Sequence, residues 1–395
     1  MKKTIRDYEL MGRKVIIRVD FNVPMKDGII QDDTRVVASL KTIKYAIDRG
    51  AKIILFSHLG KVKEEADLEK KNLYPVSVRL SELLGKKVLF SSKTRGIELE
   101  NMVDKLDNGD VLLVQNTRYE DLDGKKESGC DEELSKYWAS LGDLFINDAY
   151  GTCHRAHASN VGISKYLPNG IGFLVEEEVL KLDGILNDDT RDFVVVMGGA
   201  KVHDKIKVIE NLITKCDKLI IGGGMAYTFL KAKGYDIANS IMDEESLEFC
   251  KKIIEQYGDK IILPVDHVVS SSLESEETRI ALNGEFLVNE MGLDIGPRTI
   301  ELFCEVLRNA KRVILNGPMG CFENKLYQNG TKVIYDFVGN NVEKALIGGG
   351  DSVSAVNQLS NPELFYHIST GGGATLEYLE GTPLPGIQVI NSLED

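Results

Sequence analysis

The sequence has no apolar run that reaches the roughly 20 residues needed by a membrane-spanning helix. Its first residues, Met1–Tyr8, carry charges where a signal peptide would have its apolar stretch. It also has no C-x-x-C pair, and its six cysteines are scattered along the chain. Scattered cysteines are typical of reduced thiols rather than of a disulfide framework. We therefore expect a soluble, cytoplasmic protein that does not bind membranes.

The sequence also has no excess of basic residues. The net charge is −13, and it is unevenly distributed. Residues 1–165 carry 28 Lys and Arg against 26 Asp and Glu, whereas residues 166–395 carry 20 against 35. Nucleic-acid binding needs a cationic face that neutralises phosphates, so we do not expect it. The near-neutral first part can still place several cations around one small anion. The alternative is that the asymmetry reflects ordinary surface charge.

The common nucleotide signatures are absent too. The sequence contains neither G-x-x-x-x-G-K-[ST] nor a G-x-G-x-x-G followed by an acidic residue at the spacing of a dinucleotide fold. The protein-kinase motifs H-R-D and D-F-G are also missing. If the chain binds a nucleotide, it uses a different arrangement.

What the sequence does contain is a recurring unit: a short β-branched run, a polar or glycine-rich turn, and a helical stretch. Strands that alternate with helices in this way predict parallel sheets with helices on both faces. The first half has such runs at Lys14–Asp20, Lys52–Ser57, Lys86–Phe90, Val111–Gln115 and Leu144–Asn147. The second half has them at Phe193–Met197, Lys218–Ile221, Lys260–Pro264, Arg312–Leu315, Ala345–Ile347 and Tyr366–Ser369. We predict an α/β protein with two doubly wound, Rossmann-like sheets.

A length of 395 residues exceeds the size at which a single core stops growing, so two domains are expected. The Pro- and Gly-containing stretch Leu167–Gly172 precedes one long helical segment, Phe173–Leu186. We place the domains at residues 1–170 and 171–379, joined by this segment as a hinge helix. The tail at residues 380–395 contains two prolines that interrupt a helix.

Polar side chains follow the apolar runs of the first half, where ligands bind in open parallel sheets. They include the pairs Asp20 and Asn22, Ser57 and His58, Asn116 and Arg118, and Asn147 and Asp148. Arginine presents a planar fork that fits phosphate and carboxylate, and four arginines lie near these strand ends: Arg18, Arg35, Arg118 and Arg155. The alternative is that each arginine forms a separate surface ion pair. We favour an anion site, with His58 as a hydrogen-bond donor rather than a general base.

The turns of the second half are rich in glycine, which lets the backbone approach a ligand closely. They are Gly198–Lys201, Gly222–Gly224, Gly317–Gly320, Gly348–Ser352 and Gly371–Gly373. A turn of this kind that opens a helix can hold a phosphate with its free N–H groups. Five of them indicate a nucleotide, with Lys201 and Lys205 as candidate phosphate-binding cations.

Asp351, directly after three glycines, is the candidate Mg²⁺ ligand, because Mg²⁺ commonly takes one or two carboxylates together with phosphate oxygens. Alternatively, Asp351 is a helix N-cap. A zinc site at His154 and His157 is not expected, since the H-x-x-H spacing is common by chance and no second cluster completes it.

These motifs resemble those of the phosphoglycerate kinase family, in the same order and over essentially the whole chain. The matching stretches are Arg18–Pro24, Asp32–Arg35, Ser57–Gly60, Asn147–Gly151, His154–Ser159, Gly198–Val202, Leu293–Pro297, Asn316–Gly320 and Thr370–Ala374. The resemblance implies reversible, Mg²⁺-dependent phosphoryl transfer between ATP and the carboxylate of 3-phosphoglycerate, which forms 1,3-bisphosphoglycerate and ADP in glycolysis. It also implies a monomer with in-line transfer after hinge closure, and a C-terminal tail that packs back on the N-terminal domain.

The resemblance assigns residues by position. The acid would be held by Asp20, Phe21, Asn22, Arg35, His58, Leu59, Gly60, Lys61, Arg118 and Arg155. The nucleotide would be held by Lys205, Gly223, Glu323, Gly349, Gly350, Asp351 and Ser352, with Asp351 on Mg²⁺. The migrating phosphoryl group would be surrounded by the catalytic residues Arg35, Lys201, Gly371 and Gly372.

The sequence departs from the family pattern at several positions. Lys61 stands where an arginine usually contacts the substrate, and a lysine is a point charge rather than a fork, so we expect weaker substrate binding but no loss of activity. Ser352 replaces a threonine, Gln115 a glutamate, and Cys153 a small residue. Two alternatives of other classes are a NAD-dependent oxidoreductase and a non-catalytic two-lobed binding protein.

Overall fold

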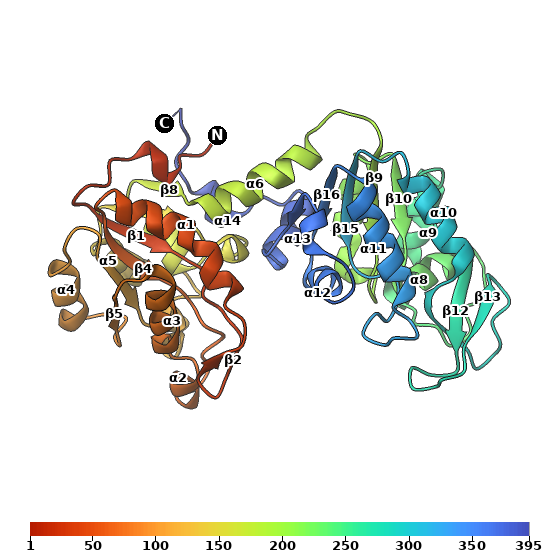
Figure 1. The fold of residues 1–395 in the computed structure, drawn as a ribbon, viewed down its shortest axis with the longest axis horizontal. Helices are drawn as coiled ribbons and strands as arrows, with labels where there is room; N and C mark the ends of the chain where they lie inside the picture. Colours follow the sequence, from red (N-terminus) through yellow and green to blue (C-terminus); the bar gives the residue numbers. More distant parts are fainter. Residues whose placement is uncertain (395) are drawn as a thin grey trace. The chain divides into compact units, whose positions relative to one another are not determined.

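The β-branched runs form two six-stranded parallel sheets in the computed structural model, which describes residues 1–394 (Figure 1). The chain divides into two compact units, each containing one of these sheets. Unit 1 comprises Met1–Leu180 and the chain from Pro383 onward, and unit 2 comprises Lys181–Thr382. The predicted fold class, two doubly wound Rossmann-like sheets, is confirmed. The chain passes from unit 1 to unit 2 inside helix α6 (Phe173–Leu186).

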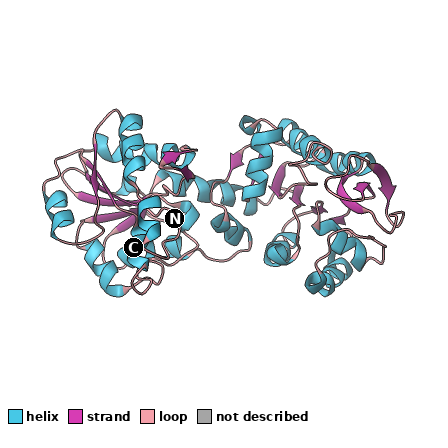
Figure 2. Ribbon diagram, turned by 90° about the horizontal axis from the view of Figure 1, so that it is seen from below, coloured by secondary structure: helices cyan, strands magenta, loops and turns pink. Residues whose placement is uncertain are grey.

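Unit 1 has the strand order β5-β6-β4-β1-β7-β8. These strands are β1 (Lys14–Arg18), β4 (Lys52–Phe56), β5 (Val88–Ser91), β6 (Val111–Val114), β7 (Leu144–Asn147) and β8 (Asn169–Ile171). The connecting segments contain the two-residue strands β2 (Met25–Lys26) and β3 (Ile29–Ile30) and the helices α1 (Thr34–Asp48), α2 (Ala66–Lys70), α3 (Tyr74–Leu84), α4 (Ile97–Asp104) and α5 (Glu132–Ala139). Figure 2 shows the strands of each large sheet lying between helices.

The four central strands of unit 1 are β6, β4, β1 and β7. Nearly all of their residues are buried, because helices cover both faces of the sheet. Their carboxyl ends lie at one edge, so the segments that follow them are neighbours. This edge is where the sequence places its polar residues.

Strand β8 was not predicted, because Asn169–Ile171 was interpreted as part of a Pro- and Gly-containing domain boundary. This short segment contains a glycine and has no β-branched run, so its propensity for strand is weak. Tertiary contacts decide its conformation instead. It pairs in parallel with β7, and Thr4 forms an isolated bridge to Ile171.

The C-terminal tail forms a short helix, α14 (Pro385–Gln388), although we had expected its prolines to interrupt any helix. Pro385 is the first residue of α14, a position at which the missing proline N–H has no intrahelical partner to lose. Gly386 donates to the carbonyl of Cys153 and accepts from the side-chain amide of Asn147. The tail therefore contacts the loop that follows β7.

Unit 2 has the strand order β11-β10-β9-β15-β16-β17. Its strands are β9 (Phe193–Met197), β10 (Lys218–Ile221), β11 (Ile261–Ile262), β15 (Arg312–Asn316), β16 (Lys344–Ile347) and β17 (His367–Ile368). Its helices are α7 (Ile206–Ile213), α8 (Met225–Ala232), α9 (Leu247–Tyr257), α10 (Pro297–Leu307), α11 (Asn329–Asn341), α12 (Gly350–Leu359) and α13 (Gly373–Leu379).

Unit 2 also contains a second sheet that the sequence analysis missed. Three antiparallel strands pair in the order β13-β12-β14, with bounds Arg279–Leu282, Asp266–Ser270 and Met291–Ile295. We expected one parallel sheet per half, and no helix separates these three strands, so the strand–helix alternation does not reveal them. Residues of β13 alternate between buried and more exposed, which is the pattern of a sheet with one solvated face.

No helix within residues 1–394 is both long and apolar enough to cross a membrane.

The N-terminus of α6 is held by a buried carboxyl group. Oδ1 of Asp148 accepts hydrogen bonds from the backbone N–H groups of Leu174 (2.9 Å) and Val175 (3.4 Å). Gly172 leaves the space for this carboxyl, because a Cβ there would lie 2.2 Å from Oδ1. Burial raises the pKa of Asp148 to about 7, and the hydrogen bonds that it accepts oppose this effect only in part. Asp148 therefore changes between its neutral and its charged form at a pH of about 7.

Asp148→Asn is predicted to change how the stability of unit 1 depends on pH. Because the folded-state pKa of Asp148 is raised, the folded protein holds the proton more tightly than the unfolded chain does. The contribution of Asp148 is therefore greatest below about pH 4 and falls as the pH rises to about 7. Asparagine keeps the acceptor oxygen and does not ionise, so the stability of the variant relative to the wild type should rise across this window and then level off.

Urea unfolding at several pH values checks this prediction. The chain has a single tryptophan, Trp138, which is completely buried in unit 1 and reports on that unit by fluorescence. An equal decline of stability with pH in variant and wild type would contradict the role of Asp148.

Candidate functional site

The first candidate site lies in unit 1, where the segments after β1, β4 and β6 meet. Arg35, on the first turn of α1, donates to both carboxylate oxygens of Asp20, at 3.1 and 3.2 Å. Asn22 donates its backbone N–H to the same carboxylate and accepts from the N–H of Gly60 at 2.8 Å. The structure therefore brings together four of the predicted acid-binding residues.

Asp20 remains a carboxylate in this setting. Burial alone would raise the pKa of Asp20, but His58, Arg35 and Arg18 together with the N–H of Asn22 lower it below its ordinary value. Because Asp20 is already ionised and paired with Arg35, it is a poor candidate for a general base.

His58 is surrounded by cations. Burial lowers its pKa to about 3; the carboxylate of Asp20 opposes this shift, and Arg18, Arg118 and Arg35 add to it. The imidazole is therefore neutral at physiological pH and can donate one hydrogen bond without adding a charge.

Asn116 organises this site, although we had only noted it as a polar residue at a strand end. Its side-chain oxygen accepts from the N–H of Leu59 and of Arg118, both at 3.0 Å. Its amide nitrogen donates to the carbonyls of Leu59 and Lys71. One buried side chain thus connects the segments that carry His58 and Arg118. Asparagine directly after a buried strand is the sequence signal for such a residue.

The remaining predicted acid-binding residues differ in their settings. Arg118 forms an ion pair with Asp121 (2.6 Å) and is mostly buried. Arg155 and Lys61 are exposed, and neither side chain has an ion pair or hydrogen bond in the described part of the chain. Phe21 and Leu59 have buried side chains that pack in the core of unit 1, so only the backbone at these positions can face a ligand.

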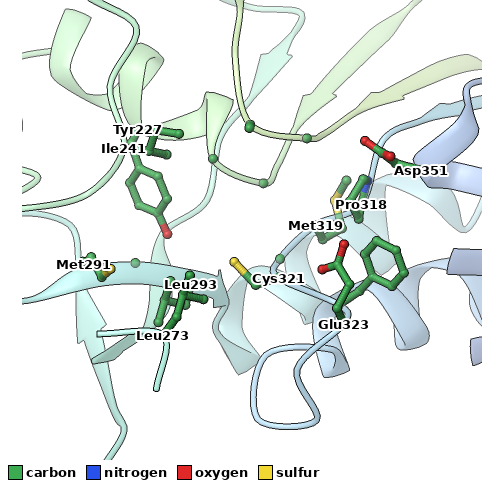
Figure 3. A pocket seen from close by; sticks show the side chains of 17 residues that line it. Tyr227, Ile241, Leu273, Met291, Leu293, Pro318, Met319, Cys321, Glu323 and Asp351 are labelled. Carbon is green, nitrogen blue, oxygen red and sulfur yellow. The ribbon is translucent and has the colours of Figure 1, made fainter. Parts of the chain in front are cut away.

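The second candidate site is a cavity of about 300 Å³ in unit 2. Figure 3 shows its apolar wall, with the ring of Tyr227 opposite Met291 and Leu293. Pro318 and Met319 line another side, and the carboxylates of Glu323 and Asp351 lie at its margin. An apolar cavity with a few polar groups is the usual form of a small-molecule site.

Three glycine turns pack backbone against backbone beside this cavity. A Cβ on Gly198 would lie 2.0 Å from the carbonyl oxygen of Pro318, and one on Gly223 would lie 2.6 Å from the nitrogen of Gly199. Gly223 also has a φ of +63°, and Gly317 one of +102°, which side chains other than glycine rarely adopt. These glycines are required by the close approach of the turns after β9, β10 and β15.

The side chain of Lys205 connects the turn after β9 to the end of β15. Its ammonium group donates to the carbonyls of Gly198 (2.7 Å) and Asn316 (2.9 Å). Burial lowers the pKa of Lys205 to about 8, while Asp351 and Asp204 oppose the shift. The cation therefore lies against the backbone of the turns.

The turn before α12 leaves its backbone accessible. A Cβ on Gly350 would meet no atom within 4 Å, and Gly349 has a φ of +94°. Asp351 is exposed in the first turn of this ten-residue helix. Ser352, by contrast, is buried, and its hydroxyl accepts from the N–H of Gly317 at 2.6 Å. Its side chain therefore supports the neighbouring turn.

Two groups of predicted catalytic residues do not line the cavity. Lys201 is exposed in the turn after β9. Gly371 and Gly372 follow the edge strand β17, and a Cβ on Gly372 would meet no atom within 4 Å. All three lie after the carboxyl end of a strand of the same sheet.

Few side chains are arranged to bind a metal ion. Across residues 1–394, no group of three or more His, Cys, Asp and Glu side chains could hold a metal ion. Mg²⁺, however, binds commonly through one carboxylate together with phosphate oxygens. The exposed carboxylate of Asp351, beside open glycine backbone and a cavity, fits that requirement.

Gly198→Ala is predicted to disrupt unit 2, because the new Cβ would collide with the backbone of Pro318 and Gly317. We expect a loss of about 1–3 kcal/mol or more in stability. Hydrogen exchange measured by mass spectrometry should become faster in β9 and β15. Gly350→Ala is the control, since its Cβ would enter open space. Unchanged exchange in Gly198→Ala would refute the close packing of these turns.

Comparisons with known proteins agree with the family resemblance of the sequence motifs. The family model described as phosphoglycerate kinase matches residues 5–382. The phosphoglycerate kinase of Enterococcus faecalis is 55% identical over 394 residues, and that of Listeria welshimeri is 53% identical over 392; each alignment covers 99% of both chains.

Solved structures are similar as well. The phosphoglycerate kinase of Coxiella burnetii has a TM-score of 0.91 at 35% identity, and that of Pyrococcus horikoshii has 0.82 at 30%. Each covers 98% of both chains. None of these relatives supports the alternatives of an oxidoreductase or a non-catalytic binding protein. The chain therefore belongs to the phosphoglycerate kinase family of phosphotransferases.

Proposed function

We propose that the chain transfers a phosphoryl group, reversibly and with Mg²⁺, between ATP and the carboxylate of 3-phosphoglycerate. The observation that carries this proposal is the pairing of two different sites in one chain. Unit 1 contains a cationic cluster around a neutral histidine, and unit 2 contains an apolar cavity beside open glycine turns. The first suits a small anion, and the second suits a nucleotide.

For the acid, the exposed Arg155 and Lys61 and the partly exposed Arg35 offer cations that a ligand can reach. Asn22 and His58 add uncharged polar groups beside them. We assign these residues, with Asp20, Gly60 and Arg118, to 3-phosphoglycerate. Phe21 and Leu59 would contribute only through the backbone of their loops.

For the nucleotide, the base would occupy the apolar cavity lined by Tyr227, Met291 and Leu293. The phosphates would approach the glycine backbone near Gly349 and Gly350, where the first turn of α12 offers free N–H groups. Lys205, Gly223, Glu323, Asp351 and Ser352 complete this assignment, with Lys205 and Ser352 acting mainly on the turns that they support.

The chemistry of the acceptor explains why no general base is needed. The carboxylate of 3-phosphoglycerate is already ionised at neutral pH, so it can attack without losing a proton. Neither Asp20 nor His58 has the pKa of an effective base, in agreement with such a reaction. What the protein must supply is positioning and neutralisation of the charge on the transferring group.

We assign that neutralisation to Arg35, Lys201 and the backbone N–H groups at Gly371 and Gly372. Mg²⁺, when bound with the nucleotide, would screen the negative charge of the phosphates. Asp351, in the first turn of α12 and on the lining of the cavity, is the carboxylate that would hold it. Transfer also requires hinge closure, because the two substrates bind to different units.

The first test is ATP-dependent phosphorylation of 3-phosphoglycerate, with and without Mg²⁺. Arg35→Ala and Lys201→Ala should each lower kcat by about 10³-fold, since each removes a cation from the transferring group. Arg279→Ala is a matched control for Arg35, because its ion pair with Glu290 has almost the same exposure as that of Arg35 with Asp20. Lys215→Ala, at the opposite edge of the sheet, is the control for Lys201. A wild type without turnover would overturn the proposal.

Asp351→Asn is predicted to raise the Mg²⁺ concentration needed for half-maximal activity by about 10-fold or more, as expected for the loss of one charged interaction. Because Asp351 is exposed, the melting temperature should not change. Glu323→Gln, which removes the other carboxylate at the cavity margin, should have a smaller effect. Equal effects of both variants would contradict the assignment of the metal to Asp351.

We also propose that the protein acts in the cytoplasm as a monomer. All six cysteines are unpaired, as expected for a reducing compartment. Sedimentation analysis would test the monomeric state.

A further inference from the structure

A buried arginine contacts the histidine of the anion site. Arg18 is completely inaccessible to solvent, and its Nη2 lies 3.2 Å from Nδ1 of His58. Its Nε donates to the hydroxyl of Ser159 at 2.8 Å, and its Nη1 donates to the carbonyl of Val19. All three guanidinium nitrogens therefore have partners inside the protein, which distinguishes Arg18 from Arg35.

The direction of the contact with His58 follows from the chemistry of arginine. A guanidinium group has five N–H donors and no acceptor. Nδ1 of His58 must therefore accept the hydrogen bond from Arg18. A neutral imidazole has one N–H, so its proton lies on Nε2.

The position of Arg18 is itself set by a buried hydrogen-bond chain. The hydroxyl of Ser159 accepts from Arg18 and donates to Oε1 of Glu127 (2.5 Å). The backbone N–H of Ser159 donates to Oε2 of Glu127 at 2.9 Å. Glu127 and Ser159 are both fully buried. Nδ1 of His157 is 3.8 Å from Oε1 of Glu127, which is too far for a hydrogen bond.

The hydrogen bonds from Arg18 to Ser159 and from Ser159 to Glu127 have the same donor-to-acceptor direction. Because the Ser159 proton points to Glu127, only the lone pairs of its oxygen are available to Arg18. The opposite tautomer of His58 would place an N–H against an N–H of Arg18. Nε2 of His58, at the other side of the ring, forms no hydrogen bond with any residue in the described range 1–394.

We propose that Glu127, Ser159 and Arg18 are positioning residues that hold His58 in its Nε2–H tautomer, ready to donate a hydrogen bond to the bound acid. The inference rests on the proposed function, because it takes the anion site of unit 1 as the site of 3-phosphoglycerate. None of the three residues needs to touch the substrate. They act through the orientation and the protonated nitrogen of His58.

The tautomer can be measured directly in the wild-type protein without substrate. The chain has six histidines, so ¹⁵N-histidine NMR is tractable, and comparison with His58→Gln assigns the His58 signals. We expect a pyridine-type ¹⁵N shift at Nδ1 and a pyrrole-type shift at Nε2. A pyrrole-type shift at Nδ1 would overturn the proposal, whatever the enzyme does with its substrates.

The variants Ser159→Ala and Glu127→Gln test whether the hydrogen bonds between Glu127, Ser159 and Arg18 set the tautomer of His58. Each should mix the two tautomers of His58 and raise the KM for 3-phosphoglycerate by about 2- to 10-fold, the range expected for one weakened hydrogen bond. The KM for ATP should stay within about twofold, because the nucleotide site lies in unit 2. If both variants keep the wild-type tautomer and the wild-type KM for the acid, the proposal is wrong.

Ser164→Ala is the matched control. Ser164 is also a buried serine close to Ser159 in sequence, but its hydroxyl donates to the backbone carbonyl of Asn160. Its removal should leave the His58 signals unchanged. If Ser159→Ala does not fold, the wild-type tautomer still decides the proposal. If the tautomer is as expected but 3-phosphoglycerate does not shift the His58 signals, the proposed substrate is wrong and the hydrogen-bond chain stands.

Discussion

Parallel pairing of buried strands is the constraint on which both candidate sites depend. In each large sheet the strands point the same way, so all their carboxyl ends lie at one edge. Residues that are far apart in sequence, such as Asp20, His58 and Arg118, become neighbours because each follows a different strand of one sheet. Strand burial on both faces makes this arrangement rigid, since shifting one strand would disturb two helical layers.

At this edge, single polar side chains hold the loops in place of regular secondary structure. Asn116 connects two segments in unit 1 by four hydrogen bonds, and Lys205 binds two glycine turns in unit 2. A buried N–H or carbonyl without a partner costs free energy, so each of these side chains stabilises backbone that would otherwise be unsatisfied. The functional loops are therefore ordered by groups that need not touch a ligand.

The sequence was sufficient for much of the fold and less so for the roles of individual residues. Its β-branched runs correspond to every strand of the two large sheets except β8, whose Asn-Gly-Ile sequence has no strand propensity and is ordered by pairing with β7. The three-stranded antiparallel sheet was missed because no helix separates its strands, so the strand–helix alternation does not reveal them. These elements depend on tertiary contacts that no local pattern expresses.

The sequence likewise does not distinguish the roles of similar residues at the candidate sites. Arg18 and Arg35 look equivalent in the sequence, because both are arginines in the stretch from the end of β1 to the first turn of α1. In the structure Arg18 is fully buried and contacts His58, whereas Arg35 is partly exposed beside Asp20. Likewise, the hydroxyl of Ser352 supports the Gly317 turn. Spacing indicates that such residues gather at one edge, but burial and hydrogen-bond direction decide which of them can meet a ligand.

Burial is the main cause of the neutral state of His58, and the nearby arginines add to it. A second positive charge on the imidazole would face the guanidinium of Arg18 at 3.2 Å, and two unit charges about 4 Å apart repel by about 4 kcal/mol at an effective dielectric constant of 20. A neutral donor avoids this repulsion and still satisfies one oxygen of an anion. The candidate anion site thus combines a few accessible cations with an uncharged donor.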